Sequence, residues 1–251
     1  MDTRLQKIYE DMENNTLGID DTFQFKCRTC GKCCKNRHDI ILTTRDLHNI
    51  ARSLGRSMQY IVEQYCHVYI GHSSRIPIVR LKPTGPEQTC PLLRNRRCIV
   101  HSAKPIVCAL FPLGRAMNVE ASKSCVELTE KIQPTYFLQP DTCGSKDQTH
   151  TVRSWLEEFG VPVQDEFYSL WTENFIYLSD AFRKFDELKI PDKQMQPLWD
   201  LTYSAAYVSY DTEKDLIPQF QESMVRLRGF FEKVMAVSEK HFGGMRNGTQ
   251  T

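Results

Sequence analysis

The spacing of hydrophobic residues predicts a C-terminal half built from helices. After residue 145, apolar side chains recur at helical intervals, which predicts helices over Thr151–Phe159, Gln164–Leu188 and Gln194–Phe242. The clearest stripe consists of Phe167, Leu170, Trp171, Phe175 and Leu178. Such a stripe is typical of a helix packed against a core, and it could also form one wall of a ligand pocket.

Two shorter helices are predicted in the N-terminal half. In the first, Thr43 or Thr44 is placed to cap the N-terminus, Asp46 lies in the first turn, and Gly55 ends the helix. Ser57 is placed to cap a second helix with the sequence MQYIVEQYCHVYI. We expect both helices to contribute packing rather than chemistry.

The remaining segments are less regular. Residues 1–22 are helix-like at Leu5, Ile8 and Met12, whereas Ile76–Gly114 is rich in proline, glycine and β-branched residues and predicts loops and short strands. The expected fold is mainly α, with an irregular, loop-rich, metal-stabilised cysteine-cluster region. The predicted parts are a helical leader (1–22), the cysteine-cluster domain (23–145), a helical region packing on it (146–242) and a flexible tail (243–251).

The net charge and composition limit the classes of binding partner that are expected. The chain of 251 residues has a net charge of +1, so it lacks the general field that attracts nucleic acid or an anionic membrane. The N-terminal residues have neither the apolar stretch of a signal peptide nor the basic bias of a transit peptide, and no later run could span a bilayer. We expect a cytoplasmic protein with an unidentified protein or small-molecule partner, and neither nucleic acid nor membrane as a partner.

The ten cysteines are concentrated in one part of the chain. All of them lie between Cys27 and Cys143. In the cytoplasm thiols are kept reduced, so metal ligation accounts for them better than disulfides do. Thiolates are soft ligands that select zinc, copper(I) or iron–sulfur clusters over magnesium or calcium.

Eight cysteines are the candidate metal ligands. Cys27, Cys30, Cys33 and Cys34 follow a Cys-x-x-Cys-x-x-Cys-Cys pattern, in which two-residue spacers let the backbone turn around one metal or cluster. Because Cys33 and Cys34 are adjacent, one of them could serve a second site or only pack. The other four candidates are Cys90, Cys98, Cys108 and Cys143. Cys66 and Cys125 are expected to be ordinary residues.

Other polar residues accompany the cysteines. Seven nearby basic residues either offset thiolate charge or lie in solvent: Arg28, Lys32, Lys35, Arg37, Arg94, Arg96 and Arg97. His38 and His101 are more typical of hydrogen-bond donors around a metal site than of ligands. No phosphate-binding loop, dinucleotide-binding glycine motif or hydrolase motif is present. Catalytic residues are therefore unassigned, and enzymatic activity is an open question.

The motifs FKCRTCGKCCKNR, ILTTRDL, CPLL, CIVHSAKP and CALFPLGR resemble those of the YkgJ-like cysteine-cluster family, also described as the CxxCxxCC zinc- or iron-chelating domain. The resemblance runs from Phe23 to Arg115 and implies metal binding by its cysteines, whereas Cys143 is proposed from local context. A similar cysteine pattern occurs in flagellin lysine N-methylase, which is described as carrying an iron–sulfur cluster and using S-adenosylmethionine.

Three functions follow as alternatives. The leading one is an iron–sulfur protein, with a 4Fe–4S cluster as the expected cofactor and a redox or cluster-supported catalytic role. The second is a zinc-binding structural or interaction module. The third, implied by the resemblance, is an S-adenosylmethionine-dependent protein lysine N-methylase, although the chain has no clear glycine loop for that cofactor.

Overall fold

The protein consists of two compact units. The computed structural model describes residues 10, 12, 14–117, 134–139 and 143–242. Unit 1 contains the described residues up to Ile40 and those from Leu81 to Ser169, and unit 2 contains Ile41–Arg80 and the described residues from Leu170 onward. About 50% of the structure is helical and about 20% is strand, so the expectation of a mainly α protein is confirmed in these coarse terms.

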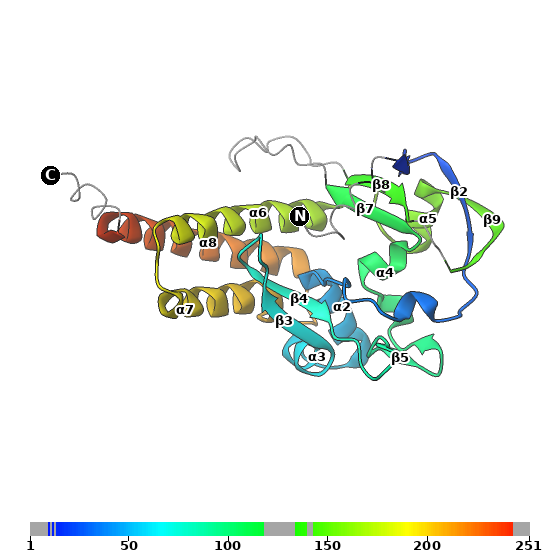
Figure 1. The fold of residues 1–251 in the computed structure, drawn as a ribbon, viewed down its shortest axis with the longest axis horizontal. Helices are drawn as coiled ribbons and strands as arrows, with labels where there is room; N and C mark the ends of the chain where they lie inside the picture. The colour runs from blue at the N-terminus through cyan, green and yellow to red at the C-terminus, as the bar shows by residue number, and fades with distance from the viewer. Residues whose placement is uncertain (1–9, 11, 13, 118–133, 140–142, 243–251) are drawn as a thin grey trace. The chain divides into compact units, whose positions relative to one another are not determined.

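Unit 1 is built from short strands and short helices (Figure 1). The described strands are β1 (Thr16–Leu17), β2 (Thr22–Lys26), β5 (Leu93–Arg94), β6 (Arg97–Cys98), β7 (Leu113–Met117), β8 (Pro134–Leu138) and β9 (Ser145–Thr151). They pair as the antiparallel sets β1-β8-β7, β2-β9 and β5-β6. The described helices are η1 (Lys32–Cys34), η2 (His101–Ala103), α4 (Ile106–Leu110) and α5 (Val152–Glu158).

The core of unit 1 lies between β2 and α5. Residues of β2 alternate between exposed and buried, so that Phe23 and Phe25 both point inward. Trp155 contacts both rings edge-on, with ring centroids 5.7 Å apart in each pair. Its indole N–H donates a hydrogen bond to the Leu110 carbonyl at 3.0 Å, which ties α5 to α4.

Unit 2 contains the long helices and one two-stranded sheet. Its elements are α2 (Thr44–Leu54), α3 (Met58–Tyr65), β3 (Cys66–Ile70), β4 (Pro77–Leu81), α6 (Glu166–Glu187), α7 (Asp192–Tyr203), η3 (Ser204–Val208) and α8 (Leu216–Phe242). The first residues of α6 and the last residue of β4 are assigned to unit 1. In the described part of the chain, none of the helices combines the length and apolarity needed to cross a bilayer.

The capping residues predicted from sequence are confirmed in α2 and α3. The Thr43 hydroxyl accepts from the Asp46 backbone N–H, while the Asp46 carboxylate accepts from the Thr43 N–H, which forms a capping box. Gly55 ends α2 in the left-handed conformation with φ of 60°. Ser57 caps α3.

The predicted second helix is too long. It ends at Tyr65, and the residues Cys66–Ile70 form strand β3, which pairs with β4. The alternation of polar, β-branched and aromatic residues in CHVYI suits a strand once a partner strand is available. Cys66 is therefore the first residue of a strand rather than part of a helix face.

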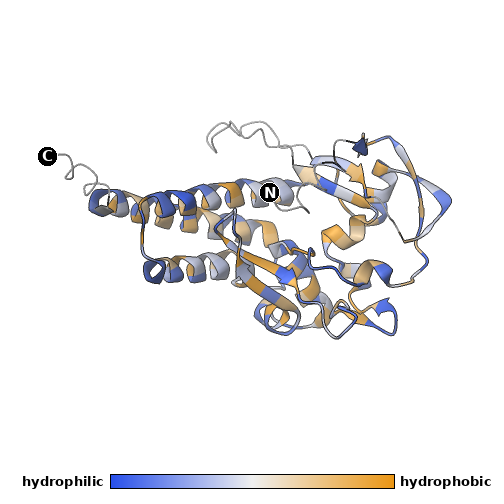
Figure 2. Ribbon diagram, in the orientation of Figure 1, coloured by the Kyte–Doolittle hydropathy of each residue, from blue (hydrophilic) through white to orange (hydrophobic). Residues whose placement is uncertain are grey.

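The three long helices pack through aromatic side chains. Trp171 contacts Phe220, and Phe182 contacts Phe231, so α6 and α8 run in the same direction (Figure 1). Phe182 also stacks on Trp199 of α7, which runs in the opposite direction (Figure 1). Figure 2 shows hydrophobic and hydrophilic residues alternating along these helices. The stripe predicted on α6 therefore packs in the core.

The predicted helix Gln194–Phe242 is interrupted. Helix α7 ends at Tyr203, continues as the π-helical segment η3, and is separated from α8 by a turn. In that turn the Gln219 side chain accepts from the Asp211 N–H and donates to the Asp211 carbonyl. Pro218 lies in the first turn of α8, where its missing N–H removes no helical hydrogen bond. The leader residues Leu5 and Ile8 and the tail 243–251 lie outside the described residues.

We predict that Gly114→Ala destabilises the protein, whereas Gly229→Ala stabilises it. A Cβ at Gly114 would lie 2.2 Å from the buried Phe137 ring on the neighbouring strand, and overpacking of this kind costs roughly 1–3 kcal/mol. A Cβ at Gly229 in α8 meets nothing within 4 Å, so alanine should add about 0.5–1 kcal/mol. Urea unfolding of both variants measures the difference, and a neutral Gly114→Ala would contradict the close packing.

Candidate metal centre

The pairing of β2 with β9 brings two distant cysteine segments together. Lys26, next to Cys27, is paired with Ser145, two residues after Cys143. Gly144 makes this approach possible, because a Cβ there would lie 2.5 Å from Cε2 of Phe25 and 3.0 Å from the Lys26 carbonyl oxygen. At this end of the β2–β9 ribbon, one cysteine therefore follows β2 and another precedes β9.

A tight turn follows β2 and arranges the next cysteines. Gly31 has φ of 72°, a left-handed conformation that glycine adopts without strain. Its carbonyl accepts from the Cys34 N–H at 3.1 Å, which starts η1. The Sγ atoms of the adjacent Cys33 and Cys34 are 4.0 Å apart, so the two thiols lie close to each other.

The second cysteine group consists of Cys90, Cys98 and Cys108, and backbone pairing places Cys90 beside Cys34. The Cys90 N–H donates to the Cys34 carbonyl at 2.8 Å, and the Asn36 N–H donates to the Gln88 carbonyl at 2.9 Å. Cys98 lies on β6 opposite Leu93. Cys108 lies within α4, the helix that Trp155 anchors to the core.

The thiols are close enough to alter one another's ionisation. The pKa of Cys33 is raised by its interaction with the Cys34 thiol and by burial, and is lowered by the Cys143 thiol. Burial, followed by the Cys33 and Cys30 thiols, raises the pKa of Cys143 to about 11.

The influence of Cys33 extends to the second group. Burial raises the pKa of Cys90, and the Cys98 and Cys33 thiols raise it further. Six candidate cysteines thus interact in one network with Cys33 at its centre: Cys30, Cys33, Cys34, Cys90, Cys98 and Cys143.

Two basic residues lie beside this network. Arg37 forms a bidentate ion pair with Asp39 at 2.8 and 2.9 Å. Burial lowers the pKa of Arg37, but Asp39 and then Cys108 and Cys33 raise it more, which places the guanidinium near both thiols. Lys104 lowers the pKa of Cys33. Sequence reasoning included Arg37 but missed Lys104, whose position between Cys98 and Cys108 was the available signal.

The other predicted basic residues point elsewhere. Lys35 forms an ion pair with Glu87 at 2.5 Å. The remaining ones are exposed: Arg28, Lys32, Arg94, Arg96 and Arg97. They belong to the solvated surface, one of the two alternatives that the sequence left open.

The remaining residues considered from sequence are exposed, belong to unit 2 or lie outside the described residues. Cys27 is exposed, and its Sγ accepts from the Thr29 N–H at 3.4 Å. His38 and His101 are exposed, and Lys104 followed by burial lowers the pKa of His101. Cys66 belongs to unit 2. Cys125 lies outside the described residues.

The donor chemistry of this cluster fits a soft metal. None of the nine described cysteines is in a disulfide. Within the ranges that the structure describes, no three Cys, His, Asp or Glu side chains have the geometry of a metal site, so ligation of one ion requires the side chains to turn towards it. The thiol network can supply zinc or iron with sulfur ligands once the thiols lose their protons.

Comparison with known families agrees with this chemistry. A family model described as "CxxCxxCC: Putative zinc- or iron-chelating domain" matches residues 26–159, more than half of the chain. The chain belongs to this family. The CxxCxxCC domain covers the β2 end, both cysteine groups and the β9–α5 segment, which supports metal binding, with zinc and iron as the candidate metals. Neither the curated proteins nor the solved structures gave a match.

We predict that Cys143 and Cys33 of the chelator-treated full-length protein react slowly with iodoacetamide at pH 8, whereas Cys27 reacts fast. The raised pKa values of Cys143 and Cys33 leave little thiolate at that pH, and Cys27 is exposed. Mass spectrometry of peptides from the full-length protein measures the order. In urea the three rates should converge, and an equal rate for Cys143 and Cys27 in the folded protein would contradict the network.

Proposed function

We propose that the protein binds iron as an iron–sulfur centre, of the 4Fe–4S type, held by cysteine thiolates of unit 1. The observation that carries this proposal is the network around Cys33, in which six thiols from four chain segments interact. A 4Fe–4S cluster takes four thiolates, as one zinc ion does, but it holds them further apart, so thiols that come from several loops fit it better. Such a set suits a centre larger than one ion.

The basic residues support a thiolate cluster. Removing protons from several neighbouring thiols accumulates negative charge, which is unfavourable in a partly buried site. Arg37, held by Asp39, and Lys104 lie where they offset that charge near Cys33 and Cys108. When bound, an iron–sulfur centre supplies one-electron transfer, and these residues would tune its reduction potential.

A single zinc ion is the second candidate, favoured by one distance. Two thiolates on a tetrahedral zinc ion are about 3.8 Å apart, given a Zn–S bond of about 2.3 Å. The Sγ atoms of Cys33 and Cys34 are 4.0 Å apart, close to that separation. Zinc would make unit 1 a structural or partner-binding module whose folding is coupled to metal binding.

Metal analysis of protein purified without oxygen decides between these candidates. Iron, zinc and acid-labile sulfide are measured per chain, with visible spectra before and after dithionite. Iron with matching sulfide and a bleachable band supports the iron–sulfur proposal. Zinc without sulfide or colour overturns it and supports the second candidate.

We predict that Cys30→Ser lowers metal affinity by more than about tenfold. Loss of a residue that only hydrogen-bonds a metal ligand already lowers affinity by about that much, and loss of a ligand should cost more. The reason is that the Cys30 thiol interacts with Cys143 inside the network. The matched control is Cys66→Ser, a buried cysteine of unit 2, which should keep its metal content. Metal per chain and thermal unfolding are measured for both variants, and equal metal loss from the two would contradict the ligand set.

A further inference from the structure

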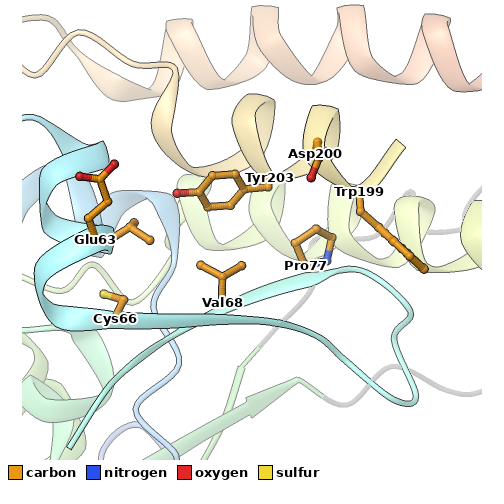
Figure 3. Close-up of a pocket in the computed structure, with 8 residues that line it drawn as sticks. Glu63, Cys66, Val68, Pro77, Trp199, Asp200 and Tyr203 are labelled. Carbon is orange, nitrogen blue, oxygen red and sulfur yellow. The ribbon is translucent and has the colours of Figure 1, made fainter. Parts of the chain in front are cut away.

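Unit 2 contains a cavity that the metal proposal does not use. Its volume is about 360 Å³, the size of a small-molecule site (Figure 3). The wall is formed by α3, the β3–β4 sheet and α7. The lining residues include Glu63, Val68, Pro77, Asp200 and Tyr203.

Hydrogen bonds hold the cavity in shape. The indole N–H of Trp199, which also lines the cavity, donates to the Arg75 carbonyl at 3.0 Å, and the Tyr207 hydroxyl donates to the Pro77 carbonyl at 3.1 Å. Helix α7 is thus tied to the turn between β3 and β4, and the π-helical segment is tied to the first residue of β4. The charge of Arg75, near the Trp199 ring, is paired with Asp186 at 2.6 Å.

The hydroxyl of Tyr203 is also engaged. It donates to the Gln59 side chain of α3 at 3.1 Å. Burial, with the nearby Cys66 and Glu63, raises the pKa of Tyr203 to about 12, so this hydroxyl keeps its proton at neutral pH. The indole N–H and the phenol O–H that line the cavity therefore already donate to protein acceptors.

The charged groups of the cavity are two carboxylates. Glu63 accepts from Gln59 at 2.8 Å, and Asp200 accepts from Gln196 at 2.9 Å. In the described part of the chain, neither carboxylate forms an ion pair with a basic side chain. The cavity thus offers hydrogen-bond acceptors and negative charge to a ligand.

The two carboxylates lie at opposite ends of the Tyr203 side chain. The hydroxyl end reaches Gln59, one helical turn from Glu63, whereas Asp200 precedes Tyr203 by one turn on α7. Figure 3 shows Glu63 beyond the hydroxyl and Asp200 beyond the other end of the side chain. Val68 and Pro77 provide apolar surface beside the tyrosine ring.

We propose that this cavity binds a linear alkyl diamine, with one ammonium group at Glu63 and the other at Asp200. The alkyl chain lies along the apolar surface between them, and the aromatic ring of Tyr203 adds attraction for the cations. This site is independent of the metal centre and goes beyond the proposed function.

Calorimetric titration of the full-length, metal-loaded protein tests the site with three ligands of equal chain length. We expect cadaverine to bind with a stoichiometry of one and roughly three- to fivefold more tightly than n-pentylamine, the effect of one exposed ion pair. Pentanol should bind more weakly still, and added salt should weaken only the amines. Equal affinity for all three ligands, or no binding of cadaverine at millimolar concentration, would overturn the proposal.

Charge-neutralising variants locate the two contacts. Glu63→Gln and Asp200→Asn should each reduce cadaverine affinity to about that of n-pentylamine for the unaltered protein, a roughly three- to fivefold loss. Glu239→Gln, an exposed change on α8, is the matched control and should bind as the unaltered protein does. Both carboxylates are exposed, so the variants should fold, and their metal content should not change. Unchanged cadaverine binding in both variants would refute the assignment.

Discussion

The antiparallel pairing of β2 with β9 is the constraint on which the candidate metal centre depends. It joins segments more than a hundred residues apart in sequence and places the Cys143 loop beside the turn that carries Cys30 and Cys33. The pairing is held by Phe23 and Phe25, whose burial against Trp155 fixes which face of β2 points inward. A shift of the register by one residue would expose both rings and remove Cys143 from the network.

Burial of several thiols in one place opposes their ionisation, which metal binding requires. The raised pKa values of Cys33, Cys90 and Cys143 express that opposition. Arg37 and Lys104 offset only part of it, because each is a single positive charge beside several thiols. A bound metal cation would supply the remaining positive charge. The ionised thiols are therefore more favourable with a cation bound than without one.

Local signals were predictable from sequence, whereas long-range pairing was not. The caps Thr43 and Ser57 and the end at Gly55 follow from side-chain chemistry within a few residues. The switch from helix to strand at Cys66 depends on β4, and the break after Tyr203 depends on contacts of the π-helical segment with other elements, including that of Tyr207 with Pro77. The helix and strand propensities of the residues contain no information about such distant partners.

The candidate site was predictable only as a set of residues. Cysteine spacing predicted candidate ligands but not which of them lie together: the proximity of Cys33 to Cys34, Cys90 and Cys143 depends on backbone pairing far along the chain. Sequence context could not separate Cys27, which lies in solvent, from the others. The ligand assignments, the 4Fe–4S cluster, S-adenosylmethionine, the cytoplasmic location and the division at residues 22, 145 and 242 stay predictions.

The two units differ in how they are stabilised, and this difference bears on what a metal would do. Unit 2 has capped helices and a core in which Phe182, Phe220 and Phe231 are fully or nearly fully buried, so it has the apolar contacts of a self-sufficient helical domain. Between Lys26 and Pro105, by contrast, unit 1 consists of turns and very short elements. Such turns and short elements gain little stability from burial. Cross-links between them reduce the entropy of the unfolded chain, and this effect grows with the length of chain that a cross-link encloses. Thiolate ligands contributed by separate loops are such cross-links, so metal binding would stabilise unit 1 and leave the aromatic core of unit 2 unaffected.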